Sequence, residues 1–252
     1  MTPSIPLTGR TALITGSTAG IGRAAALLLA EAGAEVIVTG RDISRGNDTV
    51  ATITRAGGRA RFLAADLTDL ASLRALAEAA GAVDVLVNNA AVQPLSPAVS
   101  QDIDGFDAAI AVNLRAPYFL TAAIAPAMLA RGSGSIVNIS SMTATTAMAG
   151  FSVYTATKAA MEALTRTWAA EFSPSGVRVN AVSPGPTRTE AVLTAVAEAL
   201  GAGGEAQLGE LTLLGRMAEP REIAEVILFL AEDRSSYLTG AVLAADAGRT
   251  AA

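Results

Sequence analysis

The sequence predicts an α/β protein whose core is a parallel sheet. Short apolar segments bounded by glycine, such as R-T-A-L-I-T-G at residues 10–16, are typical of strands buried on both faces. Longer segments between them carry apolar residues at helical spacing, so strands and helices alternate along the chain. No repeat or low-complexity linker divides the 252 residues, and we therefore expect one domain over 1–252.

Cysteine and histidine are both absent from the chain. Their absence excludes disulfides, thiolate chemistry, Ser-His-Asp hydrolysis and imidazole metal sites, and we assign no residue to a metal. The net charge of −5, without a cluster of Lys and Arg, argues against a nucleic-acid partner. No apolar run approaches the ~18 residues that span a bilayer, and the start lacks a secretory signal. We expect no membrane partner and a cytoplasmic location.

A glycine-rich loop follows the first predicted strand and precedes a helix that ends at Gly33. Glycines let backbone N–H groups approach a pyrophosphate, and the N-terminus of the helix adds its dipole. This context favours a dinucleotide-binding loop over an ordinary tight turn. The candidate contacts in T-G-S-T-A-G-I-G are Gly16, Ser17, Thr18, Gly20, Ile21 and Gly22.

The next strand, residues 35–39, ends at Gly40 and Arg41. An acidic residue at this place would bind the adenosine ribose of NAD, whereas a guanidinium can bind the 2′-phosphate of NADP. Arg41 therefore favours NADP(H). The alternative is a surface arginine that pairs with Asp42.

Further strands end in polar residues. A helix is predicted at 42–57, and the strand after it, at 60–65, leads into Asp66 and Leu67. A helix is then predicted at 69–80, and the strand after it, at 83–87, leads into N-N-A-A. Ligands of open parallel sheets lie outside the carboxyl ends of the strands, so Asn89 and Ala90 would border the same crevice as Gly16 and Arg41. An Asx turn is the alternative for the asparagines.

A long helix is predicted over 101–131, with Asn113 and Pro117 inside it. Proline cannot donate to the carbonyl four residues earlier and clashes with it, so the carbonyl of Asn113 loses one helical hydrogen bond. The freed carbonyl could hold a water, or the proline could be a tolerated bend. A strand over 133–141 follows and ends in Ser140 and Ser141.

Tyr154 and Lys158 lie four residues apart on a predicted helix at 151–173, which puts them on one face. An ammonium ~5 Å from the phenol would favour phenolate by about two pKa units at an effective dielectric of about 20. The pair is a candidate proton donor, although the same spacing is also common for solvated pairs.

The last third of the chain contains a strand at 177–182 that leads into S-P-G-P-T-R-T, then a helical and glycine-rich segment. With Gly201, Gly203 and Gly204 as breakers, residues 186–215 are predicted to form a mobile substrate lid. A helix at 219–231 and a strand at 241–246 complete the chain.

These features, in this order and spacing, resemble the short-chain dehydrogenase/reductase family over essentially the whole chain, and its compact one-domain branch by glycine spacing and length. They are T-G-S-T-A-G-I-G, N-N-A-A, Asn113, Ser141, Tyr154-x-x-x-Lys158 and S-P-G-P-T-R-T. The resemblance implies a Rossmann-type, doubly wound, seven-stranded parallel sheet of order 3-2-1-4-5-6-7 with helices on both faces.

The resemblance also implies four catalytic roles. Tyr154 would protonate the carbonyl oxygen, and Lys158 would lower the pKa of Tyr154 and bind the nicotinamide ribose. Ser141, chosen over Ser140 because it lies thirteen residues before Tyr154, would hold the substrate oxygen. Asn113 would hold the water of a proton relay.

For the cofactor, the resemblance implies contacts along the remaining strand ends, in addition to Tyr154 and Lys158. The nicotinamide would meet Pro184 and Gly185, its carboxamide and the pyrophosphate would lie near Thr187 and Thr189, and the adenine would meet Asp66 and Leu67.

The chain departs from the family pattern at two positions. Ala91 stands where N-N-A-G has glycine, and Ala247 stands where D-G-G has glycine. Neither change touches a reacting group, so we expect them to affect the shape of the substrate site rather than the chemistry.

The main hypothesis is an NADP(H)-dependent oxidoreductase that moves hydride between nicotinamide and a small-molecule ketone or secondary alcohol, NAD(H) being the less favoured cofactor. A 3-oxoacyl-(acyl-carrier-protein) reductase is the alternative, with Arg188 and Arg216 as candidate docking residues for an acidic carrier. A nucleotide-binding module without activity and a sugar-modifying enzyme fit less well. The family usually assembles through its two long middle helices and its terminal strand, so we expect a homotetramer, or a homodimer.

Overall fold

The computed structural model describes residues 6–251, so the predicted domain is described over this range, and residues 1–5 and 252 lie outside it. Its sheet has seven strands in the order β3-β2-β1-β4-β5-β6-β7, and each strand pairs in parallel with its neighbours. This confirms the predicted fold class. The strands are β1 Thr11–Ile14, β2 Glu35–Gly40, β3 Arg59–Ala64, β4 Val85–Asn88, β5 Gly134–Ile139, β6 Val177–Pro184 and β7 Val242–Ala245.

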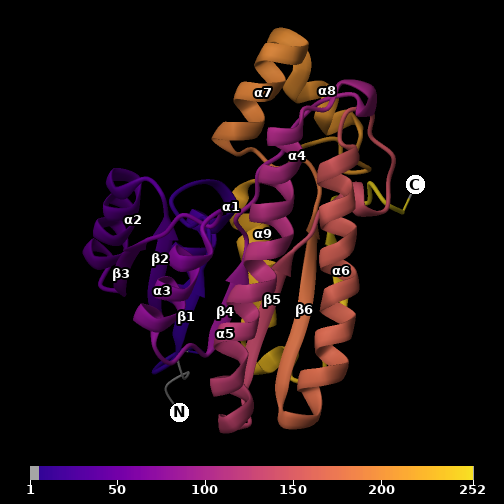
Figure 1. The fold of residues 1–252 in the computed structure, drawn as a ribbon. Helices are drawn as coiled ribbons and strands as arrows, with labels where there is room; N and C mark the ends of the chain where they lie inside the picture. Colours follow the sequence, from indigo (N-terminus) through magenta and orange to yellow (C-terminus); the bar gives the residue numbers. More distant parts are fainter. Residues whose placement is uncertain (1–5, 252) are drawn as a thin grey trace.

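Helices cover both faces of the sheet (Figure 1). One layer contains α1, α2 and α9, and the other contains α3, α5 and α6. Strand side chains alternate between the layers, so Ala12 and Ile14 face the first and Leu13 faces the second. The helices are α1 Gly20–Glu31, α2 Ile43–Arg55, α3 Leu70–Ala80, α4 Ile103–Ile110, α5 Ala116–Arg131, α6 Ser152–Phe172, α7 Glu190–Leu200, α8 Gly204–Glu210 and α9 Pro220–Ala231.

The long helix predicted over 101–131 is interrupted. A π-helical turn, Ala111–Arg115, separates α4 from α5 and carries Asn113 at its centre. Pro117 explains the interruption, because it cannot donate to the carbonyl of Asn113. By length and composition alone the stretch Ile103–Arg131 could cross a membrane, yet 56% of its most apolar window is buried inside the fold.

The predicted lid contains more helix than the sequence indicated. Beyond the glycine breakers the chain forms α8, and α7 and α8 lie past the upper end of the sheet in Figure 1. Thr187 pairs with Ala218 at the start of this segment. Near its end the N–H of Leu213 donates to the carbonyl of Ala247 at 2.9 Å. The segment is therefore anchored at both ends, and its mobility stays a prediction.

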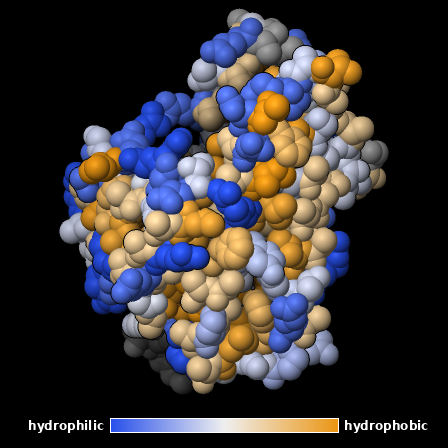
Figure 2. Space-filling view, in the orientation of Figure 1, coloured by the Kyte–Doolittle hydropathy of each residue, from blue (hydrophilic) through white to orange (hydrophobic). Residues whose placement is uncertain are grey.

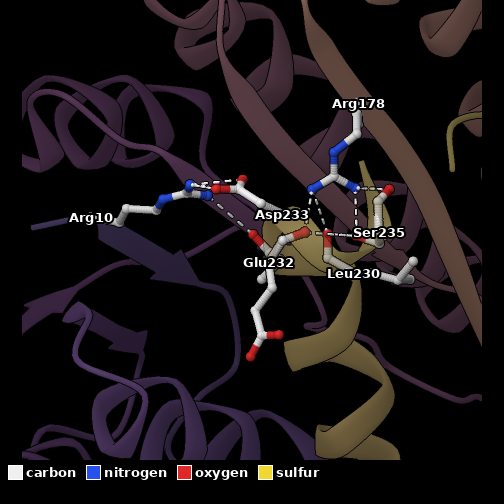
Figure 3. Close-up of polar contacts among 7 residues, drawn as sticks. Arg10, Arg178, Leu230, Glu232, Asp233 and Ser235 are labelled. Atoms are coloured by element: carbon white, nitrogen blue, oxygen red, sulfur yellow. Dashed lines mark hydrogen bonds and ion pairs between the residues drawn. The ribbon is translucent and has the colours of Figure 1, made fainter. Parts of the chain in front are cut away.

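Two arginines join the amino-terminal edge of the sheet to the end of α9 (Figure 3). Arg178 of β6 donates to the carbonyl oxygens of Leu230 at 3.0 Å and Glu232 at 3.1 Å, and to Oγ of Ser235 at 2.8 Å. Arg10 binds Asp233 through one Nη at 2.7 and 2.8 Å. These donors satisfy carbonyls that the end of a helix leaves without partners. This edge is closed by structural contacts, whereas the carboxyl edge is open to ligands.

Ala247 has a left-handed backbone, with φ of 53°. It occupies one of the two positions at which the chain departs from the family pattern. A non-glycine residue pays roughly 1–2 kcal/mol for this conformation because its Cβ meets the backbone. The neighbouring Asp246 fixes the turn by accepting from the N–H groups of Gly248 and Thr250 at 3.0 and 2.9 Å. These hydrogen bonds therefore hold Ala247 in a backbone conformation that is unfavourable for alanine.

We predict that Ala247→Gly raises the free energy of unfolding by up to about 1 kcal/mol, because relief of strain exceeds the entropy that glycine adds to the unfolded chain. Denaturant unfolding at fixed protein concentration measures the change. Ala244→Gly, in strand β7, is the control, and it should lower stability by about 0.5–1 kcal/mol. Equal losses in both variants would show that Ala247 carries no strain.

Candidate active site

A cavity of about 840 Å³ runs along the carboxyl edge of the sheet. In Figure 2 hydrophilic residues border the hollow between the α2 side of the molecule and the α7 region. The cavity brings together most of the predicted cofactor residues: Gly16, Thr18, Gly20, Ile21, Arg41, Asp66, Leu67, Asn89, Ala90, Tyr154, Lys158 and Thr189. Strand ends far apart in sequence therefore form one groove.

The glycine loop forms a cradle packed so closely against its neighbours that its glycines leave no room for side chains. Gly16 has φ of 66°, and a Cβ there would lie 2.9 Å from Cα of Ala90. A Cβ on Gly22 would lie 2.4 Å from the carbonyl oxygen of Gly16. Nδ2 of Asn89 holds the loop by donating to the carbonyl oxygens of Thr15 at 2.8 Å and Gly16 at 3.2 Å. Asn89 thus shapes the cradle rather than closing an ordinary turn.

Five predicted cofactor contacts lie outside the cavity lining: Ser17, Gly22, Pro184, Gly185 and Thr187. Ser17 donates to the carbonyl of Ile14 at 2.7 Å, and Thr187 donates to the carbonyl of Gly185 at 3.0 Å. Their side chains support the loops behind the groove. That they contact a cofactor stays a prediction.

Arg41 and Asp42 do not pair as the alternative interpretation proposed. Asp42 caps α2 by accepting from the N–H of Arg45 at 3.0 Å, and its carboxylate lies 3.6 Å from Nε of Arg45. In the described part of the chain, no hydrogen bond or ion pair is found for Arg41, which is exposed in the groove. Its charge helps to hold the pKa of Asp66 below the usual range, after the larger effect of hydrogen bonds from Thr68.

These groups fit a nicotinamide dinucleotide. The side-chain-free cradle at the start of α1 suits a pyrophosphate, and the unpaired Arg41 suits a phosphate or ribose at the end of β2. Asp66 and Leu67 line the adenine side of the same cavity, and Tyr154 and Lys158 line its other end.

Tyr154 lines the groove, and Ser141 lies beside it. Ser141 is buried, accepts from the N–H of Thr143 at 3.2 Å and is near enough to Tyr154 to lower the pKa of the phenol. The hydroxyl of Ser140 instead donates to Oε1 of Glu162 at 2.7 Å. Ser141 is therefore the better placed of the two serines, and its role as the oxygen anchor stays a prediction.

Lys158 is buried and donates to the carbonyl of Ile139 at 2.8 Å. Its Nζ lies 5.5 Å from the centroid of the Tyr154 ring. Burial lowers the pKa of Lys158 to about 8, and burial raises the pKa of Tyr154 to about 12 against a smaller lowering by Ser141. The pKa of Tyr154 is therefore raised and not lowered as the sequence predicted, because desolvation of the phenol is the largest effect on it.

Both polar atoms of the Asn113 side chain form hydrogen bonds. Oδ1 accepts from the N–H of Val92 at 2.8 Å, and Nδ2 donates to the carbonyl of Val92 at 2.8 Å and to Thr157 at 3.1 Å. Thr157 in turn donates to the carbonyl of Tyr154 at 2.7 Å. Asn113 thus joins the loop after β4 to the catalytic helix, and its backbone carbonyl remains the candidate for the predicted relay.

Arg45 and Glu190 also line the groove, and neither was predicted from the sequence. Arg45 lies four residues after Arg41, and Glu190 comes directly after Thr189. Both positions adjoin residues that were predicted, so proximity to those motifs was the available signal.

Comparison with known proteins places this site in a family. Residues 16–250 match the family model described as enoyl-(acyl carrier protein) reductase. Cis-4-hydroxycyclohexanecarboxylate dehydrogenase of Sinomonas cyclohexanicum is 40% identical over 96% of this chain and 97% of its own length. A solved structure described as a short chain dehydrogenase/reductase family protein is 50% identical, with a TM-score of 0.90 over 98% of this chain and 100% of its own.

A second solved structure is the 3-oxoacyl (acyl-carrier-protein) reductase of Agrobacterium tumefaciens C58 with NADP bound. It is 32% identical, with a TM-score of 0.91 over 97% of this chain and 95% of its own. The chain belongs to the short-chain dehydrogenase/reductase family. It is therefore an oxidoreductase of the class that uses NAD(P) to interconvert CH–OH and C=O groups.

We predict that the free energy of unfolding rises between pH 8 and pH 10. The unfolded chain keeps the proton of Lys158 up to its ordinary pKa of 10.5, whereas the folded protein releases it near 8. Between these values the unfolded state binds more protons, so raising the pH favours the folded state, by on the order of 1–3 kcal/mol. Denaturant unfolding across this range tests the sign, and Lys158→Met should abolish the rise. A fall in wild-type stability over this window would contradict the burial effect.

Proposed function

We propose that the protein is an NADP(H)-dependent oxidoreductase acting on a neutral ketone or secondary alcohol. The observation that carries the proposal is that Tyr154, with Ser141 beside it, shares one groove with Lys158, the glycine loop and Arg41. Two neighbouring hydroxyls at this place could bind and protonate a carbonyl oxygen beside a dinucleotide.

In the direction of reduction, Ser141 would hold the carbonyl oxygen and Tyr154 would protonate it. With a pKa of about 12, Tyr154 stays a neutral phenol at pH 7 and can donate its proton. Alcohol oxidation needs the phenolate instead. The protonated form of Lys158, whose Nζ lies 5.5 Å from the centroid of the Tyr154 ring, would stabilise it below about pH 8. The nicotinamide, when bound, supplies or accepts the hydride.

Support for NADP(H) comes from the end of β2. The carboxylate that follows this strand, Asp42, is engaged elsewhere, because it caps α2 and lies close to Arg45. Arg41 keeps its donors for a 2′-phosphate. A solved relative holds NADP.

Support for a neutral substrate comes from the walls beside Tyr154. Val92 and Ile139 line the cavity, and the ring of Phe151 lies 6.3 Å from that of Tyr154, centroid to centroid, in an edge-to-face arrangement. One relative is named as a dehydrogenase of cis-4-hydroxycyclohexanecarboxylate, a ring-borne secondary alcohol that also carries a carboxylate. Cyclic ketones with and without a carboxylate are therefore the first substrates to try.

The alternative is reduction of 3-oxoacyl groups on a carrier protein. The names of several relatives favour it, whereas the charges at the lid favour it less. Arg188 forms ion pairs with Glu205 and Glu219, and Arg216 binds Glu222 through two donors. Arginines that are already neutralised bind an acidic partner more weakly.

Assembly and location stay predictions. Tyr118 and Phe119 of α5 are 45% and 48% exposed, and the Tyr118 ring lies 5.9 Å from that of Trp168 on α6. An aromatic face shared by the two long middle helices suits the homotetramer that we propose. The cytoplasmic location also remains a proposal.

Tyr154→Phe tests the reaction. Loss of the acid should lower turnover about 10²–10⁴-fold and leave NADPH binding within about twofold. A panel of cyclic ketones, aryl ketones, oxo-esters, 3-oxoacyl thioesters and sugars, each with NADPH, is followed by loss of reduced-nicotinamide absorbance. Tyr118→Phe, which removes an exposed hydroxyl far from the groove, is the control. Near-wild-type turnover in Tyr154→Phe would remove the proposed acid, and no turnover of any substrate by the wild type would favour the module without activity.

Arg41→Ala tests the cofactor. It should weaken NADPH binding about 10- to 100-fold and NADH binding much less, because a charge-assisted hydrogen bond to the 2′-phosphate is lost. The reverse change is Gly40→Asp, but a Cβ there would lie 2.8 Å from Cγ2 of Thr18, so it is paired with Thr18→Ala. The double variant should shift preference toward NADH, with Thr18→Ala alone as the control. Equal weakening of both cofactors by Arg41→Ala would contradict the assignment.

A further inference from the structure

An ion pair connects the two sides of the groove. Nη1 of Arg45 lies 2.8 Å from Oε2 of Glu190, and Nη2 lies 3.1 Å from Oε1, so the guanidinium and the carboxylate meet through two parallel hydrogen bonds. The pair holds the pKa of Glu190 below its usual range. Of the ion-pair arrangements in proteins, this two-point one is the most directional.

The two residues come from elements that otherwise lie apart. Arg45 is in the first turn of α2, beside β2, and Glu190 is the first residue of α7, which belongs to the lid. In Figure 1 α2 and α7 lie at different corners of the molecule. Within residues 6–251, the hydrogen bonds found between α2 and α7 are those of Arg45 with Glu190. Both residues line the same cavity, so their contact lies at the groove itself.

Arg45 and Arg41 differ in their charged neighbours. Arg45 lies between two carboxylates, Asp42 at 3.6 Å and Glu190 at 2.8 Å. Arg41, four residues earlier, shows no such pairing in the described residues and remains open to the groove. Glu190 adjoins Thr189, whose methyl carbon would lie 3.1 Å from a Cβ on Gly20 of the cradle. The ion pair therefore lies close to the place that suits the pyrophosphate.

We propose that the Arg45–Glu190 pair is a strap across the cofactor groove that slows release of the bound dinucleotide. This inference rests on the proposed function, because it requires the groove to bind a nicotinamide dinucleotide. The strap joins the wall of the groove to the lid, so the lid cannot swing away from α2 until the pair breaks.

Two consequences distinguish a strap from a phosphate ligand. A strap acts on the part of the dinucleotide that NADPH and NADH share, so its loss should speed release of both. An arginine that binds the 2′-phosphate should affect NADPH alone. Because both side chains are about half exposed or more, salt should weaken a strap and quicken release from the wild type.

The test is the dissociation rate constant of NADPH and of NADH, measured by stopped-flow displacement with the fluorescence of the reduced cofactor. Glu190→Gln and Arg45→Met should each raise both rate constants about 2- to 5-fold, the range for loss of one exposed ion pair. The double variant should release no faster than the faster single variant, because each change removes the same contact. Added KCl should quicken release from the wild type and leave the double variant nearly unchanged.

Glu222→Gln is the matched control. It removes the carboxylate charge from another two-point pair, with Arg216, whose residues do not line the groove, and it should leave both rate constants unchanged. A second measurement uses the lack of native cysteine. Arg45→Cys/Glu190→Cys, bridged by a short bismaleimide after NADPH has bound, should retain the cofactor through gel filtration that strips the unbridged protein.

Unchanged release in both single variants would overturn the strap while leaving the proposed function intact, since cofactor binding itself would have been observed. Faster release of NADPH alone from Arg45→Met would also overturn it and make Arg45 a second phosphate ligand. A wild-type protein that binds neither dinucleotide would overturn the proposed function, and the strap with it.

Discussion

Burial of the Lys158 ammonium against one backbone carbonyl sets the geometry of the active site. Nζ donates to Ile139, the last residue of β5, so the catalytic helix is held against the end of a central strand. Two residues beyond Ile139 the chain reaches Ser141, and one turn before Lys158 the helix carries Tyr154. A single buried contact therefore fixes both partners of the hydroxyl pair. Its cost is visible in the depressed pKa of the lysine, and such a cost persists only where the surrounding fold holds the cation in place.

Buried amides and hydroxyls hold the elements behind this site. Nδ2 of Asn88 donates to Thr121 at 3.2 Å and to Asn138 at 2.9 Å, and Asn138 donates to Thr165 at 2.8 Å. These bonds join β4 and β5 to α5 and α6 inside the apolar layer. In surroundings of low dielectric such bonds are strong when satisfied and costly when broken, so they restrict the arrangement of strands and helices. Asn113 extends the same kind of restraint to the loop after β4 and to the catalytic helix.

The lid is held by weaker interactions. Arg188 forms its ion pairs, to Glu205 and Glu219, with side chains that are at least 40% exposed, and the Arg45–Glu190 pair is similarly open to solvent. Exposed pairs contribute little to stability and are screened by salt, whereas the cradle and the hydroxyl pair are fixed by buried contacts. This division is what a rigid reacting centre beneath the proposed mobile lid would require, since substrate and cofactor would pass such a lid in each turnover.

Much of the molecule could be predicted from its sequence. Apolar strands ending in Gly16, Arg41, Asp66 and Asn89 indicated a parallel sheet with one ligand edge, because periodicity and turn residues are local properties. Tyr154 and Lys158 were candidates from their spacing, and Ser141 from the resemblance to the family. Three features could not be read locally. Desolvation of Tyr154 depends on what packs around the phenol, and it reversed the expected pKa. Helix α8 forms beyond glycines that signal a break. Arg45 and Glu190, 145 positions apart, meet only because the sheet brings α2 and α7 to one edge. The sequence by itself determined most of the elements and the candidate reacting groups. The tertiary structure decided the burial and protonation of these groups and the contacts across the groove, because these depend on neighbours distant along the chain.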